Sequence, residues 1–174
     1  MAYGQGTFAM ANKKGTAIDA PVLDASGAKL SGADFLAQLY AAPLGSADFK
    51  AFGKAIPFRT GTAAGYFSDA TAVDVGVAAG SKVDVQIRAW RAAAGSTYEA
   101  AGGAAASLTG NFGASTTIAG LASGGGFDAA GIPILPASLT GLQGFSLTGG
   151  VVPEPSVLAL GLLGAAALVL RRRK

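Results

Sequence analysis

Carboxylates are the side chains best able to do chemistry in this chain of 174 residues, because the sequence holds no Cys and no His. Without Cys there is no disulfide, thiolate metal ligand or cysteine nucleophile. Without His the commonest general base and transition-metal ligand are missing. None of the ten acids follows the spacing of a calcium-binding loop. We therefore expect a protein that is not an enzyme, with no catalytic residue, metal site or cofactor, although a carboxylate pair at glycosidase separation stays open.

The best candidate for a binding face lies on a strand predicted over residues 82–92. Apolar and polar residues alternate strictly there, which indicates one buried and one wetter face. The buried face holds Val83, Val85, Ile87 and Ala89, and the wetter face holds Asp84, Gln86, Arg88 and Trp90. Sugar-binding sandwiches stack pyranose rings on exposed aromatic side chains beside polar groups. The wetter face is thus a candidate carbohydrate site, which Tyr40, Tyr66 and Tyr98 could join. The alternative is that Trp90 packs under a loop at the strand end.

Short strands with turn signals between them predict the scaffold of this face. Alternating valines in residues 73–77, followed by a turn at 78–81, predict a hairpin with the strand at 82–92. Further strands are expected within residues 6–12, 20–32, 35–43, 54–59, 64–69 and 141–148, and 35–43 is also compatible with a short helix. Residues 100–135 are rich in small side chains, so we expect long loops or weak edge strands there. The pattern favours an all-β body over residues 1–150, an antiparallel, jelly-roll-like β-sandwich.

Charge is distributed unevenly along the chain. Residues 1–150 contain nine basic and nine acidic residues, whereas the whole chain has a formal net charge of +3. The excess comes from the four basic residues at 171–174. Nucleic-acid binding requires basic side chains spread over a face of the body, so no nucleic-acid partner is expected.

The last 24 residues, VVPEPSVLALGLLGAAALVLRRRK, differ in character from the body. Two prolines make residues 151–156 an extended hinge. Residues 157–170 are uncharged and would span ~21 Å as a helix, less than the ~30 Å hydrocarbon core of a bilayer. This length suits a processing signal or a marginal anchor. We predict a transmembrane sorting helix with a basic tail over residues 157–174. Its large apolar residues are Val157, Leu158, Leu160, Leu162, Leu163, Leu168, Val169 and Leu170. The positive-inside rule places its basic anchor, Arg171, Arg172, Arg173 and Lys174, in the cytoplasm.

The triplet Pro153, Glu154 and Pro155, followed by an apolar helix and an arginine-rich end, resembles the PEP-CTERM sorting signal of Gram-negative bacteria. The resemblance covers about 24 residues, the length of the tail quoted above. It implies that a membrane protease, exosortase, recognises the triplet and removes the signal on the outer side of the inner membrane. The body then passes to the cell surface or the exopolysaccharide matrix. Residues 29–43, 85–101 and 141–150 are similar to segments of an uncharacterised group of such secreted proteins, which implies an all-β body; the group has no assigned activity, so this similarity implies no function.

Export would also require a secretory signal peptide, and residues 1–17 do not have the pattern of one. We expect either that the true start lies upstream or that a signal was trimmed from this chain; otherwise the protein stays in the cytoplasm. The favoured function is an exported, non-enzymatic surface or matrix protein. Its expected partners are exosortase, the inner membrane during sorting, and exopolysaccharide. The alternatives are a carbohydrate-binding module for the cell's own polysaccharide and a permanently membrane-anchored β-domain.

Overall fold

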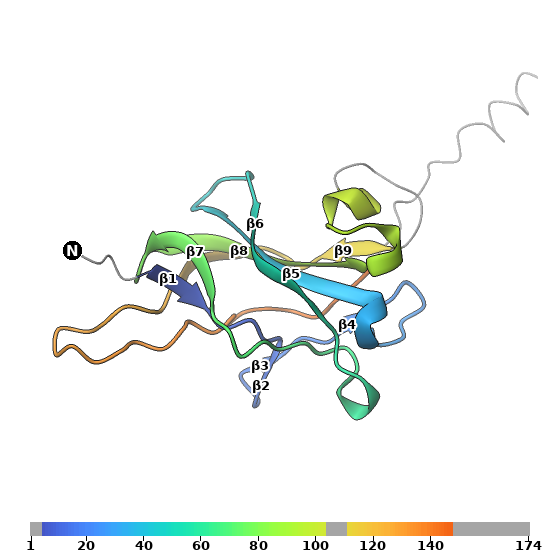
Figure 1. The fold of residues 1–174 in the computed structure, drawn as a ribbon, viewed down its shortest axis with the longest axis horizontal. Helices are drawn as coiled ribbons and strands as arrows, with labels where there is room; N and C mark the ends of the chain where they lie inside the picture. The colour runs from blue at the N-terminus through green and yellow to red at the C-terminus, as the bar shows by residue number, and fades with distance from the viewer. Residues whose placement is uncertain (1–4, 104–110, 148–174) are drawn as a thin grey trace, which may run out of the picture.

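The computed structural model describes residues 5–103 and 111–147, and within these ranges the chain is all-β (Figure 1). The predicted hinge at 151–156 and helix at 157–174 lie outside the described residues. The strands are β1 (Gln5–Phe8), β2 (Lys13–Lys14), β3 (Ile18–Asp19), β4 (Val22–Leu23), β5 (Phe35–Pro43), β6 (Lys50–Pro57), β7 (Val73–Ala78), β8 (Lys82–Arg91), β9 (Phe112–Ala114), β10 (Ile118–Ala122) and β11 (Phe145–Ser146). Short helical turns occur at η1 (Gly32–Asp34), η2 (Gly61–Ala63), η3 (Ala92–Ala94) and η4 (Glu99–Gly103).

The longest strand, β8, lies at the centre of a five-stranded antiparallel sheet. β5 pairs with β8 from Phe35 opposite Arg91 to Pro43 opposite Val83, and β6 pairs with the far edge of β5. On its other side β8 pairs with β10 near its beginning and with β9 near its end. The strand predicted at 35–43 is confirmed. The expectation of weak edge strands in the described part of residues 100–135 is also confirmed, since β9 and β10 are short.

Three two-stranded pairs complete the described pairing. β1 pairs with β7 and β2 with β3, both antiparallel, while β4 pairs with β11 in parallel. The turn expected within residues 20–32 forms: Asp24 accepts from the Gly27 amide, and Leu23 bridges to Lys29. The all-β fold class, built on antiparallel sheets, is therefore confirmed.

The hairpin expected between residues 73–77 and 82–92 is wrong. Both strands form, and the turn between them closes with a 3.1 Å hydrogen bond from the Ser81 amide to the Ala78 carbonyl. However, β7 pairs with β1, whereas β8 pairs with β5, β9 and β10. The apolar faces of β7 and β8 meet in one core from different sheets. Apolar and polar residues alternate along two strands in the same way whether the strands pair with each other or face each other from two sheets. The sequence pattern therefore could not distinguish these two arrangements.

The strand predicted at 64–69 is also wrong, since only Ser68 there makes a bridge, to Ala11. The side chain of the fully buried Asn12 makes the hydrogen bonds to this segment that a neighbouring strand would otherwise make. Its Nδ2 donates to the Gly65 carbonyl at 3.0 Å, and its Oδ1 accepts from the Phe67 amide at 2.7 Å. A side chain can thus satisfy backbone groups that a β-ladder would otherwise pair.

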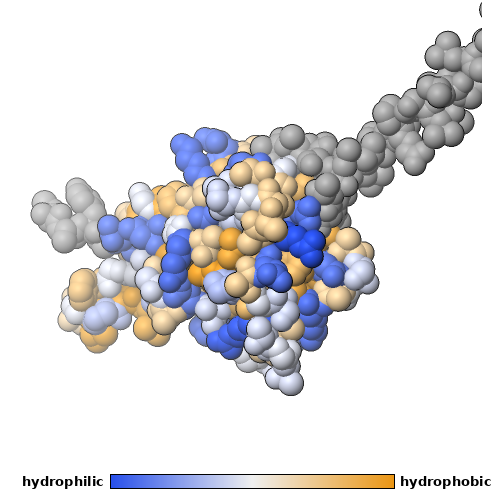
Figure 2. Space-filling view, turned by 45° about the vertical axis from the view of Figure 1, so that its right-hand side comes forward, coloured by the Kyte–Doolittle hydropathy of each residue, from blue (hydrophilic) through white to orange (hydrophobic). Residues whose placement is uncertain are grey.

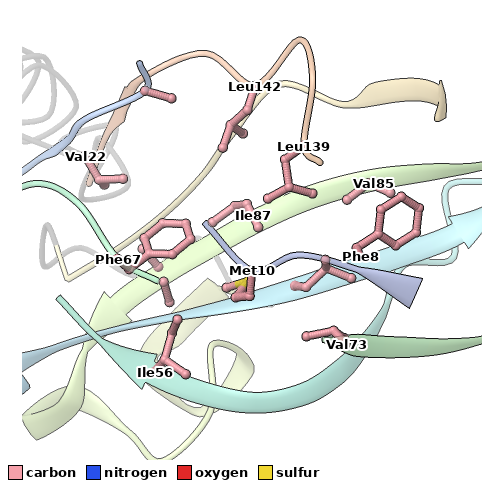
Figure 3. Close-up of a cluster of buried hydrophobic side chains, with 14 of the residues drawn as sticks. Phe8, Met10, Val22, Ile56, Phe67, Val73, Val85, Ile87, Leu139 and Leu142 are labelled. Atoms are coloured by element: carbon pink, nitrogen blue, oxygen red, sulfur yellow. The ribbon is translucent and has the colours of Figure 1, made fainter. Parts of the chain in front are cut away.

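The main hydrophobic core lies between the five-stranded sheet and the layer that contains β1 and β7 (Figure 3). Val85 and Ile87 of β8 contribute from one side, and Phe8 of β1 and Val73 of β7 from the other. Leu139, from the segment that precedes β11, also packs into this core. The face predicted to be buried is buried: Val83 is 4% exposed, and Val85, Ile87 and Ala89 are 0% exposed.

The hydrogen bonds of Asp24 in its turn make the stability of the fold depend on pH. Its Oδ1 accepts hydrogen bonds from the Ser26 hydroxyl (2.6 Å), the Ser26 amide (2.8 Å) and the Ala28 amide (2.9 Å). The bond from the Ser26 hydroxyl, with the two amides, lowers the pKa of Asp24 from its ordinary value of 3.8. Because the folded pKa is depressed, this stabilisation is complete above pH 3.8 and is lost as the pH falls through the folded pKa.

We expect Asp24→Asn to be less stable than the wild type at neutral pH, and the difference to shrink between about pH 5 and pH 2. Urea unfolding followed by circular dichroism at several pH values measures it. A difference that does not change with pH would contradict the assignment. Asp74→Asn is the control, since the Asp74 carboxylate, on strand β7, accepts a single hydrogen bond, from the Gly76 amide at 2.8 Å.

Candidate functional site

The four residues predicted as a ligand face do share one side of β8, the side away from the main core. Opposite them on β5 lie Leu36, Gln38, Tyr40 and Ala42, in register with Trp90, Arg88, Gln86 and Asp84 respectively. Beyond β8 the chain turns back through η3 and η4. Its side chains there join Tyr40 and Trp90 in a second hydrophobic cluster, with Tyr98 and Ala101 buried and Phe49 and Phe112 packed against them.

Trp90 does not form an exposed stacking platform, and this part of the predicted carbohydrate site is wrong. Its side chain is 0% exposed, and the indole Nε1 donates to the Gly95 carbonyl at 3.0 Å. Tyr98 packs edge-on against it, with ring centroids 6.5 Å apart. The alternative, that Trp90 packs under a loop at the strand end, is confirmed. A sugar ring has no access to the faces of this indole.

Arg88 lies among aromatic rings instead of facing solvent. Its guanidinium carbon is 4.2 Å from the centroid of Tyr40, 5.0 Å from Tyr98 and 5.6 Å from Phe49. It also forms an ion pair with Glu99, whose Oε1 is 3.5 Å from Nη1. Stacking on aromatic faces satisfies a weakly hydrated guanidinium at low cost. This side chain therefore connects β8, the β5–β6 loop and η4.

Tyr40 completes the cluster by donating its hydroxyl to Glu99 Oε2 at 3.0 Å. Burial, and then the hydrogen bond to the Glu99 carboxylate, raises the pKa of Tyr40 well above its ordinary value. The phenol thus stays protonated and keeps donating across the neutral range. Tyr66, the third tyrosine proposed for the site, lies elsewhere: it donates to Asp19 and has the ammonium groups of Lys13 and Lys29 beside its ring.

Asp84 was expected on a wetter face but is 5% exposed. Its two carboxylate oxygens accept from the Gly45 amide and the Gly120 amide, each at 2.8 Å. These amides belong to the β5–β6 loop and to β10, so the carboxylate joins segments on both sides of β8. Gln86 donates to the Thr117 hydroxyl at 3.0 Å. The four residues therefore lie together as predicted, but their polar groups bind one another and the backbone.

Two apolar surfaces were not identified from the sequence. Residues 124–137 project from the body and carry exposed large side chains, and a groove of about 350 Å³ opens between β7 and the five-stranded sheet. The sequence signal for the first was the dense run of apolar and turn residues in GFDAAGIPILP, residues 126–136. No sequence signal marks the groove, because its lining comes from four separate segments.

Among residues 5–103 and 111–147, no three acidic side chains gather in a way that could hold a metal ion. The described part of the chain likewise has no helix with the length and apolarity needed to cross a bilayer. Comparisons with protein-family models, curated proteins and solved structures gave no match to this chain.

Proposed function

We propose that this chain is an exported, non-enzymatic surface or matrix protein, sorted through a signal of the PEP-CTERM kind at residues 151–174. The observation that carries the proposal is the order of Pro153, Glu154 and Pro155, an uncharged apolar run, and four basic residues. Proline disfavours a helix at the residue before it, so the sequence of the triplet favours the extended form that a protease site binds. The apolar run holds the chain in the inner membrane, and the cations keep the far end in the cytoplasm.

The end of the described body supports this order of events. Leu147 is 0% exposed, and its amide donates to the Leu23 carbonyl at 2.7 Å, next to the β4–β11 pair. The triplet begins six residues later. Cleavage at the triplet would leave β11 and the core contacts of Leu147 in place. The released body is, in this proposal, a jelly-roll-like sandwich in which the β1–β7 layer faces the five-stranded sheet.

The carbohydrate-binding alternative has lost the platform on which it rested, since Trp90 is buried and Arg88 is enclosed by aromatic rings. Permanent anchoring of an uncut chain is the alternative that the experiment below separates from sorting.

The test is a Glu154→Ala variant, and a second variant with Pro153→Ala added, expressed in the native host. We expect the full-length chain to accumulate in the membrane fraction and the shortened form at the cell surface to fall by about tenfold or more, as when a recognition group is lost. Asp48→Ala is the matched control, since it likewise replaces one acidic residue by alanine, at a side chain of the body that is 75% exposed. Unchanged shortening in both variants, or no shortened form in the wild type, would contradict the proposal.

A further inference from the structure

Residues 124–137 follow β10 and form a hairpin-like projection whose two ends lie against β1 (Figure 1). Gly124 and Thr7 exchange two backbone hydrogen bonds of 3.0 Å, and on the other arm the Ala137 amide donates to the Thr7 carbonyl at 3.0 Å. Only glycine fits at 124, because a Cβ there would collide with the Leu135 carbonyl oxygen. The projection, drawn in orange, extends from the body at the left of the view.

The outer part of this projection, residues 127–135, is here called the tip, and it exposes large apolar side chains. The exposed fractions are 70% for Phe127, 60% for Ile132, 45% for Ile134 and 82% for Leu135. Figure 2 shows the hydrophobic colouring gathered on this projection. Scattered exposed apolar residues are normal, but a contiguous group on a protruding element marks an interaction site.

The backbone of the tip is prepared for burial against a partner. The Asp128 amide donates to the Ile132 carbonyl at 2.9 Å, and the Ile134 amide donates to Gly126 at 2.9 Å. Asp128 Oδ1 accepts from the amides of Ala130 and Ile132, each at 2.9 Å. Backbone donors that are already paired do not have to give up water when the tip is covered. Internal pairing thus lowers the cost of docking.

The charge of the tip favours a protein partner over a lipid surface. Asp128 is the single charged residue between 112 and 147. Segments that insert into a membrane interface usually place Lys or Arg beside their apolar side chains. A carboxylate at the tip is instead repelled by anionic lipid and costs free energy to bury in hydrocarbon. The complementary partner is an apolar groove with cations on its rim.

The groove between β7 and the five-stranded sheet has these properties, and it belongs to this same chain. Its apolar lining includes Leu44, Phe52, Val75, Val77 and Val83, with Leu44 60% exposed. Lys50 and Lys82 lie at its margin, with Asp48 as the acid among the lining residues. The margin therefore carries a net positive charge opposite in sign to the tip.

We infer that the tip of one copy docks into the groove of a second copy. Because the tip and the groove are different surfaces, each copy keeps one of them free after docking, and the contact can repeat from copy to copy. The tip, residues 127–135, is much shorter than the roughly 20–30 residues that each side contributes to a standard stable interface, so a single contact is weak. Many such contacts in a row, and a high local concentration of the protein, strengthen the association between copies. This inference goes beyond the proposed function and does not depend on the sorting signal.

The natural absence of cysteine makes the contact testable in the full chain. One chain carries Ile132→Cys and the other Leu44→Cys; they are mixed in detergent with a mild oxidant, and disulfide-linked dimers are counted on a non-reducing gel. The same detergent is present in every sample, so any association through the apolar segment at 157–170 contributes equally to all of them. The matched control replaces the groove cysteine with Thr62→Cys, an exposed position in η2.

We expect the Ile132–Leu44 dimer to exceed the Ile132–Thr62 dimer by about tenfold, because docking raises the effective concentration of the thiols. Adding Leu135→Asp to the Ile132→Cys chain should abolish the excess, since it places a charge in the docked surface. Equal yields for the two pairs would overturn the inference. It would also be overturned if phosphatidylcholine vesicles, and not a second copy, protected the Ile132→Cys thiol from a water-soluble maleimide.

Discussion

Replacing Trp90 with alanine is expected to destabilise the fold by about 3–5 kcal/mol, the usual cost of removing a large buried aromatic side chain. Trp90 is 0% exposed and packs with Tyr98 over the outer face of the five-stranded sheet. The substitution also leaves the Gly95 carbonyl without its 3.0 Å donor. A whole domain is stable by only about 5–15 kcal/mol, so this loss is a large fraction of the total and should lower the midpoint of unfolding clearly.

Urea unfolding measured by circular dichroism tests this prediction, because the variant lacks the single Trp of the chain. Trp90→Phe should recover much of the loss by refilling the volume, although it cannot donate to Gly95. Tyr66→Ala, a change to a partly exposed aromatic outside this cluster, serves as the control and should cost far less. A Trp90→Ala protein as stable as the wild type would contradict the buried position and return Trp90 to consideration as a ligand-binding residue.

Replacing Asp84 with alanine is expected to cost about 2–3 kcal/mol, because two charge-assisted hydrogen bonds disappear together. The Asp84 carboxylate accepts from Gly45 and Gly120 at 2.8 Å each, and it is 5% exposed. Its loss should loosen the β5–β6 loop and β10, which it joins across β8. If Asp84 were only a surface residue, Asp84→Ala would leave the free energy of unfolding almost unchanged.

Amide hydrogen exchange gives the specific readout for Asp84. In Asp84→Ala the amides of Gly45 and Gly120 should exchange faster than in the wild type, while the Phe67 amide, held by Asn12 Oδ1 at 2.7 Å, should keep its protection. Asp84→Asn is the conservative comparison. It keeps one acceptor oxygen and should therefore protect one of the two glycine amides. Unchanged exchange at both glycines would show that the carboxylate does not hold these segments.

The strands with strong local patterns could be predicted from the sequence. β8 follows from its alternation, and β5 follows from its apolar residues between Gly32 and Pro43. The pairing of β7 could not be predicted, because alternation says which side of a strand is buried and not which strand lies beside it. The side-chain bonds of Asn12, which replace a strand at 64–69, depend on residues 53 and 55 positions away.

The candidate site shows the same limit. The sequence placed Asp84, Gln86, Arg88 and Trp90 on one side of β8, which the structure confirms. It did not show that the segment from η3 to η4 folds back over that side, because this Ala- and Gly-rich stretch has no periodic pattern of its own. The aromatic residues on this side of β8 are buried because a later segment of the chain covers them, and local strand propensity does not predict such a contact.

The measurement that tests the central claim most directly is the intact mass of the protein recovered from its native host, with membrane and cell-surface fractions kept separate. Sorting predicts that surface material lacks the residues after Pro153, Glu154 and Pro155, while membrane material includes the full-length chain. Both masses come from one preparation, so a loss during handling would affect the two fractions alike. A mass that retains Arg171 to Lys174 in every fraction would contradict the claim and identify the tail as a permanent anchor.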